Sequence, residues 1–446
     1  MGGGSFAQDR VLAHGVGGAK DLPIPSELAI IGAVTALVVS FAVLALAWRT
    51  PRFDDDPGRP APAWLATLTA SPAFAWTLRI VGLAFAAYVG VAAVFGDNTL
   101  TNPFIGVFYV WLWVGLVPVS LLFGPFIKAV SPARTIVLLI SRASGVDPEE
   151  GMFRYPARLG YWPAALGLFA FVWLELVHPA STELGTIRLW CAVYLVTMVF
   201  GGALFGTTFT ARADPFEVYS TLVGKLSVWG HRDGRLVLRS PLANLATVVP
   251  APGLTAVVGI LFGSTAFDSF RESTVWLKFV QNSGFESRVA PDTVMLLIFS
   301  AGMAAILAVA TMLTGTHADI PRRALPDLFA HSIVPIVVGY VIAHYLTYFV
   351  EYGQTVLIQF SDPLSRGDNL LGTANLQVNY WISLHPTFLA TTKVAAVVVG
   401  HILAVVSAHD RAVKILPPQW QFKGQLPMLV AMVGFTAGGL YLLFAA

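Results

Sequence analysis

Residues 28–48 read LAIIGAVTALVVSFAVLALAW, and no charged residue interrupts them. A helix that crosses the roughly 30 Å hydrocarbon core of a bilayer needs about 20 mostly apolar residues. Inside lipid every backbone N–H and C=O group must find its hydrogen-bond partner within the segment, and a helix meets that demand. This stretch therefore predicts a membrane-spanning helix.

Stretches of the same kind recur along the whole chain. The segment at 251–267 is the weakest of them, because it is short and bounded by glycine and proline. We predict an all-α fold, a polytopic transmembrane helical bundle of about ten spanning helices. Residues 1–27 are expected to form an extracytoplasmic N-terminal segment and residues 28–446 a single transmembrane domain. The ten stretches are 28–48, 76–95, 104–126, 161–178, 187–210, 251–267, 291–314, 327–350, 386–408 and 427–445.

The overall composition agrees with a membrane protein. Hydrophobic residues make up 56% of the chain and charged residues 12%, against about 45–50% and about 25% in soluble domains. The net charge is only +2 and the basic residues are scattered, which argues against a nucleic-acid partner. Cys191 is the one cysteine, so the chain can build neither an internal disulfide nor a thiolate metal site.

Loop charges predict the orientation of the chain in the membrane. With the N-terminus outside, most loop Lys and Arg residues fall on the inside, as the positive-inside rule requires. This places the protein in the cell membrane with both termini extracytoplasmic. Two inside segments, 134–142 and 216–229, mix basic and apolar residues and are expected to be interfacial helices or loops that rest on the headgroups. The glycines of 201–206 (GGALFG) predict close helix packing.

Ionisable residues within the apolar stretches are concentrated in the last third of the chain. Each costs a few kcal/mol in lipid, so such residues face the bundle interior, pair with one another and serve as functional candidates. The stretch at 327–350 carries two histidines and 386–408 carries a lysine and a histidine, while Asp268 ends the sixth stretch. The residues concerned are Asp268, His331, His344, Lys393, His401, His409 and Asp410.

An outer polar cluster is expected around His344. His344, Tyr348 and Glu351 are spaced i, i+4, i+7 and would share one face of an α-helix. By depth, Glu175, Asp268 and Lys393 would lie at a similar level. Such a cluster could hold a metal, orient a substrate or relay protons. The alternative is that each histidine is a hydrogen-bonded packing residue, since no histidine pair has the i, i+3 or i, i+4 spacing of strong metal motifs.

Several segments resemble a family of multi-pass actinobacterial membrane proteins commonly labelled fenitrothion hydrolase-like. They are AHGVGGAKDLPIP (13–25), RYPARLGYWPAALGLFAFVWLELVHP (154–179), GSTAFDSF (263–270), FAHSIVPIVVGYVIAHY (329–345) and GHILAVVSAHDRAV (400–413).

The resemblance implies an activity, namely attack of a metal-activated water on phosphorus with departure of a phenol. It implies a divalent transition metal as cofactor, and the matching positions offer its candidate ligands. These are His14, His331, His344, His401, His409 and Asp410, and Asp268 in a matching segment is a catalytic candidate. Lys393 lies outside the matching segments and is the second catalytic candidate because it is an ionisable residue within a predicted span.

Three functions follow as hypotheses. The first is a metal-dependent hydrolase of hydrophobic organophosphorus triesters. The second is a transporter or permease for a metal ion, a proton or a small solute. The third is a non-catalytic subunit of a larger membrane complex. The expected partners are the lipid bilayer, a hydrophobic small molecule for the enzyme, and a partner subunit or a second copy of the chain.

Overall fold

The computed structural model describes residues 21–53, 56–317 and 319–445. Within them seven helical segments are long and apolar enough to cross a membrane. An eighth span results if the bent pair 103–114 and 116–123 is counted as one. The predicted all-α membrane bundle is therefore confirmed, whereas the count of about ten is not. The seven segments are Ser26–Ala47, Pro72–Phe95, Leu184–Ala213, Val289–Met312, Arg322–Gln359, Pro386–Ile415 and Lys423–Phe444.

Two predicted spans explain the difference in number. The helix α9 (Trp162–Leu176) has 15 residues, which at about 1.5 Å per residue is shorter than the hydrocarbon core. The helix α13 (Leu254–Arg271) is buried on nearly all sides. A helix that is apolar all round belongs either to lipid or to a protein interior, and hydropathy alone does not separate the two cases.

The chain divides into two compact units. Unit 1 comprises residues 1–52, 258–351 and 379–446, and unit 2 comprises residues 53–257 and 352–378. The single domain expected for 28–446 stays a prediction. Each unit is described by itself below.

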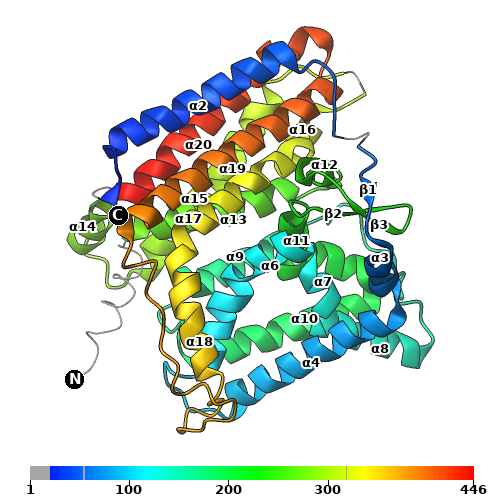
Figure 1. Ribbon diagram of the computed structural model, residues 1–446, viewed down its shortest axis with the longest axis vertical. Coiled ribbons are helices and arrows are strands. Elements are labelled where there is room, and N and C mark those ends of the chain that lie inside the picture. Colours follow the sequence, from blue (N-terminus) through cyan, green and yellow to red (C-terminus); the bar gives the residue numbers. More distant parts are fainter. Residues whose placement is uncertain (1–20, 54–55, 318, 446) are drawn as a thin grey trace. The chain divides into compact units, whose positions relative to one another are not determined.

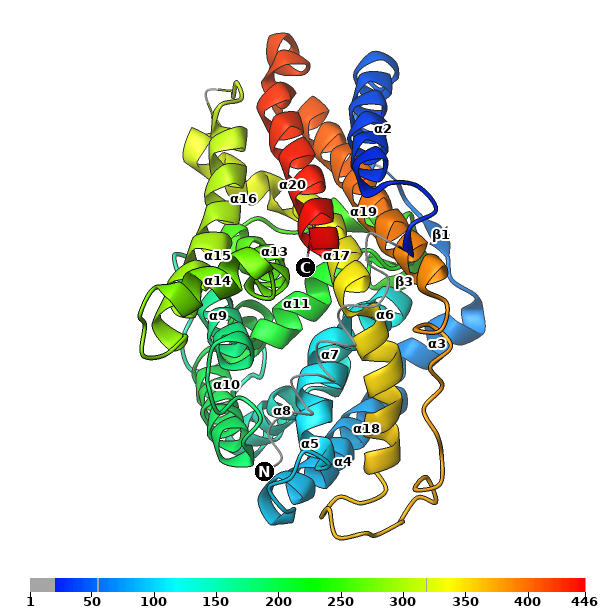
Figure 2. The same cartoon turned by 90° about the vertical axis from the view of Figure 1, so that its left-hand side faces the viewer.

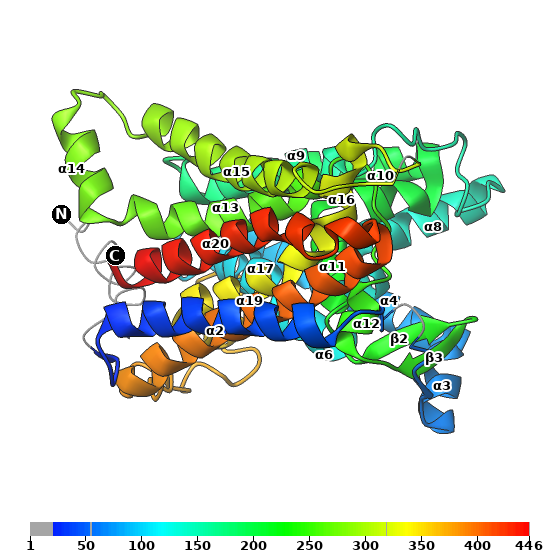
Figure 3. The ribbon, with the colours of Figure 1, turned by 90° about the horizontal axis from the view of Figure 1, so that it is seen from above.

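In unit 1, α2 (Ser26–Ala47), α19 (Pro386–Ile415) and α20 (Leu426–Ala445) lie side by side (Figures 1 and 3). The helix α17 (Val334–Thr347) packs along α19. A Cβ atom on Gly400 would stand 2.5 Å from the carbonyl oxygen of Pro335. Glycine at this crossing therefore lets the two backbones approach, as small residues do in membrane proteins.

A buried core lies at the C-terminal end of α19. Phe329 and Leu325 are fully buried there against Leu416 and Met428. The remaining helices of unit 1 are α14 (Thr274–Asn282), α15 (Val289–Met312), η3 (Arg322–Ala324), α16 (Leu325–Phe329), η4 (Ala330–Ile333), η6 (Pro418–Trp420) and η7 (Lys423–Gln425).

A π-helical turn, η5 (Tyr348–Tyr352), follows α17. Its hydrogen bonds run from residue i to i+5, so the turn takes one residue more than an α-helical turn. The face predicted for His344, Tyr348 and Glu351 assumed an unbroken α-helix, and the π turn changes that register. Glu351 accepts hydrogen bonds from the backbone N–H and the hydroxyl of Ser383.

In unit 2, helix α11 (Pro215–Gly224) is the central element, and nine of its ten residues are buried. This corrects the interpretation of 216–229 as an interfacial or surface segment. Phe171 and Trp190 pack against Phe216 in its first turn.

Another pair of neighbouring elements in unit 2 is α18 (Gly353–Gln359) and α5 (Pro103–Gly106), which Figure 2 shows beside each other. The helices of unit 2 are α3 (Ala63–Ala70), α4 (Pro72–Phe95), α5 (Pro103–Gly106), η2 (Val107–Val114), α6 (Leu116–Phe123), α7 (Phe126–Val130), α8 (Pro132–Ser144), α9, α10 (Leu184–Ala213), α11, α12 (Pro241–Leu245) and α18 (Gly353–Gln359).

The long helix α10 is broken at Gly206, where the backbone has φ +65° and ψ −161°. A neighbouring loop satisfies the backbone groups that the break frees. Thr207 N–H donates to the carbonyl of Pro148, and Phe153 N–H donates to the carbonyl of Leu204. Gly201 and Gly202 meet Phe209 and Val137 at close range, which confirms the close packing predicted for these glycines.

A small antiparallel sheet lies in unit 2 next to α3 (Figure 3). Its strands are β1 (Arg59–Pro60), β2 (Trp229–Arg232) and β3 (Arg235–Leu238), in the order β1-β3-β2. Arg232 pairs with Arg235 at the hairpin turn, and Asp233 there has a positive φ of 50°.

Candidate functional site

Asp268 and His344 form the centre of the candidate site. Asp268 lies in the last turn of α13 and His344 in the last turn of α17. His344 Nε2 is 2.9 Å from Asp268 Oδ2, and His344 Nδ1 is 3.1 Å from the hydroxyl of Ser269. One imidazole ring therefore bridges a carboxylate and a hydroxyl that are neighbours in sequence.

Two tyrosines extend this hydrogen-bonded group along α17. Tyr345 donates its phenolic O–H to Asp268 Oδ2 at 2.8 Å. The hydroxyl of Tyr340 lies 3.3 Å from Ser269 Oγ and 3.4 Å from the carbonyl of Gly439. The network thus runs from Tyr340 through Ser269, His344 and Asp268 to Tyr345.

The donors and acceptors of this network assign the tautomer of His344. The Asp268 carboxylate can only accept, so the proton of a neutral His344 ring sits on Nε2 and points at Oδ2. Nδ1 then carries a lone pair and can accept the Ser269 hydroxyl proton at 3.1 Å. This is the arrangement in which an imidazole acts as a base toward a hydroxyl and a carboxylate orients the imidazole. The carbonyl of Thr265, one turn earlier in α13, is a second and more distant acceptor for that proton at 3.4 Å.

The network is largely buried, although two of its side chains keep a small solvent-exposed fraction. The side chains of His344 and Asp268 are 9% and 12% exposed, whereas Ser269 is 2% exposed. Low solvent access strengthens the electrostatic interactions within such a network.

Lys393, predicted to act with Asp268, lies buried in α19. Its charge interacts with that of Asp21, a residue of the segment that precedes α2. The interactions described for Lys393 therefore link α19 to the beginning of unit 1.

His331 and His401 are both buried in unit 1. His331 lies in η4 and hydrogen-bonds the backbone at Leu328. His401 Nδ1 is 2.8 Å from the carbonyl of Val397, one turn earlier in α19. Its Nε2 has no hydrogen-bond partner among the described residues.

His409 and Asp410 hold the C-terminal end of α2. Asp410 Oδ1 accepts from the indole N–H of Trp48 at 3.1 Å and from the backbone N–H of Arg52 at 2.6 Å. His409 Nε2 is 2.9 Å from the carbonyl of Trp48, and Nδ1 is 3.0 Å from Gln425 Oε1. These contacts make both side chains structural anchors.

The predicted metal ligands do not come together in the part of the chain that the structure describes. No group of three His, Cys, Asp or Glu side chains there is arranged to hold a metal ion. Of the predicted site residues, His344 and Asp268 meet, while His409 and Asp410 bind the end of α2. His14 lies outside the described residues. The described side chains thus do not fit a three-ligand centre, and the divalent metal stays a prediction.

Sequence reasoning did not identify Ser269, Tyr340 and Tyr345. The signal that could have found them is the spacing of polar residues on two apolar helices. Thr265 and Ser269 are i, i+4 on α13, and Tyr340 and His344 are i, i+4 on α17. Such a spacing puts each pair on one helix face.

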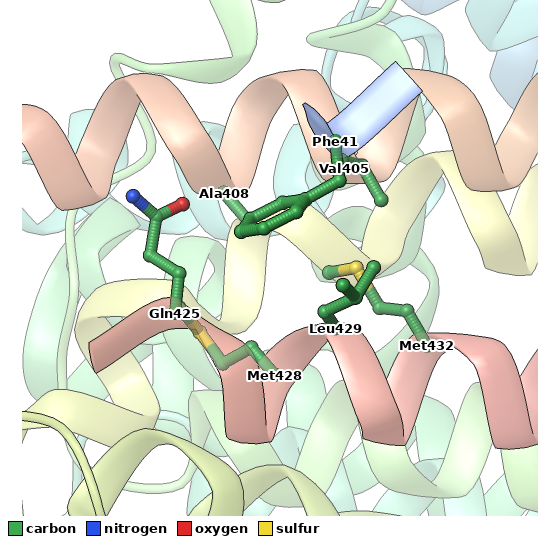
Figure 4. Close-up of a pocket in the computed structure, with 7 residues that line it drawn as sticks. All are labelled: Phe41, Val405, Ala408, Gln425, Met428, Leu429 and Met432. Atoms are coloured by element: carbon green, nitrogen blue, oxygen red, sulfur yellow. The ribbon is translucent and has the colours of Figure 1, made fainter. Parts of the chain in front are cut away.

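Each unit also contains a cavity. A cavity of about 10 Å³ in unit 1 lies between α2, α19 and α20 (Figure 4), a volume at the lower limit for one water molecule. Gln425 is the polar side chain among its lining residues, which also include Phe41, Met428 and Met432.

The cavity of unit 2 measures about 1010 Å³ and lies where α3 faces the sheet. His231 and Arg235 are among its lining residues. Burial lowers the pKa of His231, and the charges of Lys128 and Lys225 lower it further. This surface of unit 2 therefore carries a positive potential.

Comparisons of the chain with protein-family models, with curated proteins and with solved structures gave no match.

Proposed function

We propose that this multi-pass membrane protein is a hydrolase of hydrophobic esters, with the aryl organophosphorus triesters implied by its sequence resemblance as the substrate class. One observation carries the proposal, namely that His344 bridges the Ser269 hydroxyl and the Asp268 carboxylate within hydrogen-bonding distance of both. A nucleophile, a base and an orienting carboxylate in contact are the parts that acyl- and phosphoryl-transferring hydrolases share.

The chemistry assigned to these residues is a double displacement. Ser269 Oγ forms a bond to phosphorus while its proton moves to His344 Nδ1, and the bond from phosphorus to the aryl oxygen breaks. The imidazolium, stabilised by Asp268, gives its proton to the departing phenolate. A water molecule then gives a proton to Nδ1 while its oxygen bonds to phosphorus. The bond from phosphorus to Ser269 Oγ breaks, and Nδ1 returns the proton to Oγ, which restores the serine and the neutral imidazole. Tyr345 fixes the Asp268 oxygen that orients the ring.

A fluorophosphonate probe tests this assignment directly, because it labels only activated serines. The purified protein in detergent is expected to be labelled at Ser269 and to release 4-nitrophenol from diethyl 4-nitrophenyl phosphate. Ser269→Ala is expected to lose labelling and to lower turnover by about 10⁴-fold or more, as loss of a triad nucleophile does.

Ser264→Ala is the matched control. Ser264 is also buried on α13, and its hydroxyl donates to the carbonyl of Leu261 within the helix. This variant is expected to keep both labelling and turnover. Labelling that persists in Ser269→Ala, or a wild-type protein that is neither labelled nor active, would overturn the hydrolase.

A second candidate is a permease that moves protons, alone or with a solute. The continuous hydrogen-bonded row from Tyr340 to Tyr345 favours it, because rows of ionisable groups inside membranes serve as proton relays. It predicts pH-dependent flux in proteoliposomes without product formation. His344→Ala is expected to abolish that flux and Ser264→Ala to leave it unchanged.

We also propose that the protein resides in the cell membrane with both termini extracytoplasmic. The distribution of loop Lys and Arg over the ten predicted stretches supports this orientation. Ten is an even number of spans, so the chain would return to the side on which it began.

A further inference from the structure

A second group of buried ionisable residues lies in unit 2 and has no part in the proposed hydrolysis. Asp214 and Glu217 occupy the N-cap and first turn of α11. The hydroxyl of Tyr194 on α10 lies 2.9 Å from Asp214 Oδ2. Arg134 on α8 places Nη1 2.5 Å from Glu217 Oε1 and 2.8 Å from Thr210 Oγ1.

Three of the four carboxyl oxygens in this group have partners. Asp214 Oδ1 accepts from the backbone N–H groups of Phe216 and Glu217, as an N-cap does. Asp214 Oδ2 and Glu217 Oε1 are accounted for by Tyr194 and Arg134. Glu217 Oε2 has no hydrogen-bond partner among the described residues, although Glu217 is only 1% exposed.

The charges of the group do not balance when both carboxyls are ionised. Two carboxylates then face the one guanidinium of Arg134, and a net negative charge remains in a fully buried place. An uncompensated buried charge is costly, and close carboxylates disfavour their joint ionisation. A single proton on the pair removes the excess charge and gives an O–H donor to a group that is rich in acceptors.

Among the described residues, no second cation forms an ion pair with either carboxyl group. Arg212 on α10 places its guanidinium over the ring of Tyr161, 4.6 Å from the ring centre. Glu175 on α9 acts on Tyr219 with a negative charge. Cys191 and Tyr194 on α10 are neutral or negative groups. Lys128 on α7 acts on Lys225, which follows α11 at its other end.

We propose that Asp214 and Glu217 form a proton-binding site that takes up one proton from water. Binding changes the charge of the pair from −2 to −1, and Arg134 neutralises the remainder. Release of the proton restores two like charges within the first turn of α11, the helix around which unit 2 is packed.

The electrostatic surroundings of Asp214 agree with this site. Asp214 directly follows the spanning helix α10. Burial, together with the negative charge of Glu217, raises the pKa of Asp214 to about 7. Backbone hydrogen bonds from Glu217 and Phe216 and the hydrogen bond from Tyr194 oppose this rise without cancelling it.

Infrared spectroscopy of the full-length protein in detergent, titrated from acidic to alkaline pH, tests the site. The wild type is expected to show the C=O stretch of a protonated, buried carboxyl group that disappears as the pH rises through neutrality. Asp214→Asn is expected to remove this band, and Glu217→Gln to remove it or to shift its midpoint to lower pH.

Asp292→Asn is the control for a buried carboxyl with its charge satisfied. Asp292 accepts from the indole N–H of Trp276 at 2.8 Å and lies 3.4 Å from Arg288. This variant should leave the band and its midpoint unchanged. A neutral-pH band that survives in both Asp214→Asn and Glu217→Gln, or a wild type in which no such band titrates, would overturn the proposal.

Thermal unfolding provides a second measurement that is independent of the band. The folded state holds the proton at pH values where the unfolded carboxyl, with its ordinary pKa of 3.8, has lost it. The stability that comes from Asp214 is therefore lost as the pH rises through about 7. The melting temperature of the wild type is expected to fall as the pH rises from acidic values to about 7. Asp214→Asn is expected to flatten the fall, and an unchanged slope would count against the site.

Discussion

Asp410 stabilises the protein through the two donors that it accepts at the end of α2. Replacement by alanine would leave the indole N–H of Trp48 and the backbone N–H of Arg52 without their acceptor. Both hydrogen bonds are partly buried, so each lost bond costs toward the lower end of the roughly 1–3 kcal/mol of a buried donor without a partner. We expect Asp410→Ala to lower the melting temperature clearly, and differential scanning fluorimetry in detergent measures the change.

Asp319→Ala is the control for this prediction. Asp319 is exposed, and a surface substitution of this kind usually changes stability by less than about 0.5 kcal/mol. If Asp410→Ala instead melted like the wild type and lost a bound metal ion on elemental analysis, then Asp410 would be a metal ligand and not an anchor.

At the same scale, sequence reasoning found part of the candidate site. Depth along the helices placed Asp268 and His344 at a similar level, and the structure brings them together at 2.9 Å. The role of His409 and Asp410 could not be seen, because their partner Trp48 lies more than 350 positions away along the chain. A sequence gives the height of a side chain in its helix but not the neighbour that faces it.

The break of α10 at Gly206 is the clearest element-scale feature that substitution can test. A Cβ atom there would stand 2.5 Å from the carbonyl oxygen of Glu149, and its φ of +65° is strained for any other residue. We expect Gly206→Ala to destabilise the protein by about 1–3 kcal/mol, measured as a lower melting temperature.

Gly185→Ala serves as the matched variant on the same helix. A Cβ atom at Gly185 would meet no atom within 4 Å. Alanine is favoured over glycine in a helix by about 0.5–1 kcal/mol, so this variant should melt at the same or a higher temperature. Equal melting of Gly206→Ala and the wild type would mean that the break is not required.

The bounds of helices that face lipid were predicted well from hydropathy. Helices that are surrounded by other parts of the protein were predicted less well. The helices α2, α4, α15 and α20 begin and end within a few residues of the predicted stretches. The helix α13 is less apolar than α2, α4 and α15, because it carries Ser264, Thr265, Asp268 and Ser269, and it is buried on nearly all sides. Breaks such as the π turn leave no mark in hydropathy, because every residue of that turn still belongs to a helix.

At the scale of the whole molecule, the orientation in the membrane can be tested with two single-cysteine variants. In a Cys191→Ala background, the ten predicted stretches place Asp233→Cys in the β2–β3 hairpin inside and Ser283→Cys after α14 outside, because the stretch at 251–267 crosses the membrane between them. Both positions are exposed. A membrane-impermeant maleimide should label Ser283→Cys in intact cells and Asp233→Cys only after permeabilisation. The opposite pattern would reverse the orientation. Labelling of both in intact cells would mean that α13 does not cross the membrane, as in the count of eight spans.

The two units carry different kinds of polar group, and each can be tested without the other. Ser269, His344 and Asp268 belong to unit 1, whereas Asp214 and Glu217 belong to unit 2. The serine-labelling experiment therefore tests only the hydrolase proposal. The infrared titration of the carboxyl band tests only the proton-binding site.

The π turn at Tyr348–Tyr352 has a genetic consequence. A π turn contains one residue more than an α-helical turn, so the gene carries one additional codon for it. Deletion of one codon within it would close the turn as ordinary α-helix and rotate the residues that follow by about 100°. Each side chain from Gly353 to Gln359 would then point in a new direction, while His344 and the helix before it kept theirs. One codon deletion could thus reorient every side chain in the second half of this helical segment. A single-base substitution replaces one side chain and leaves the direction of the others unchanged.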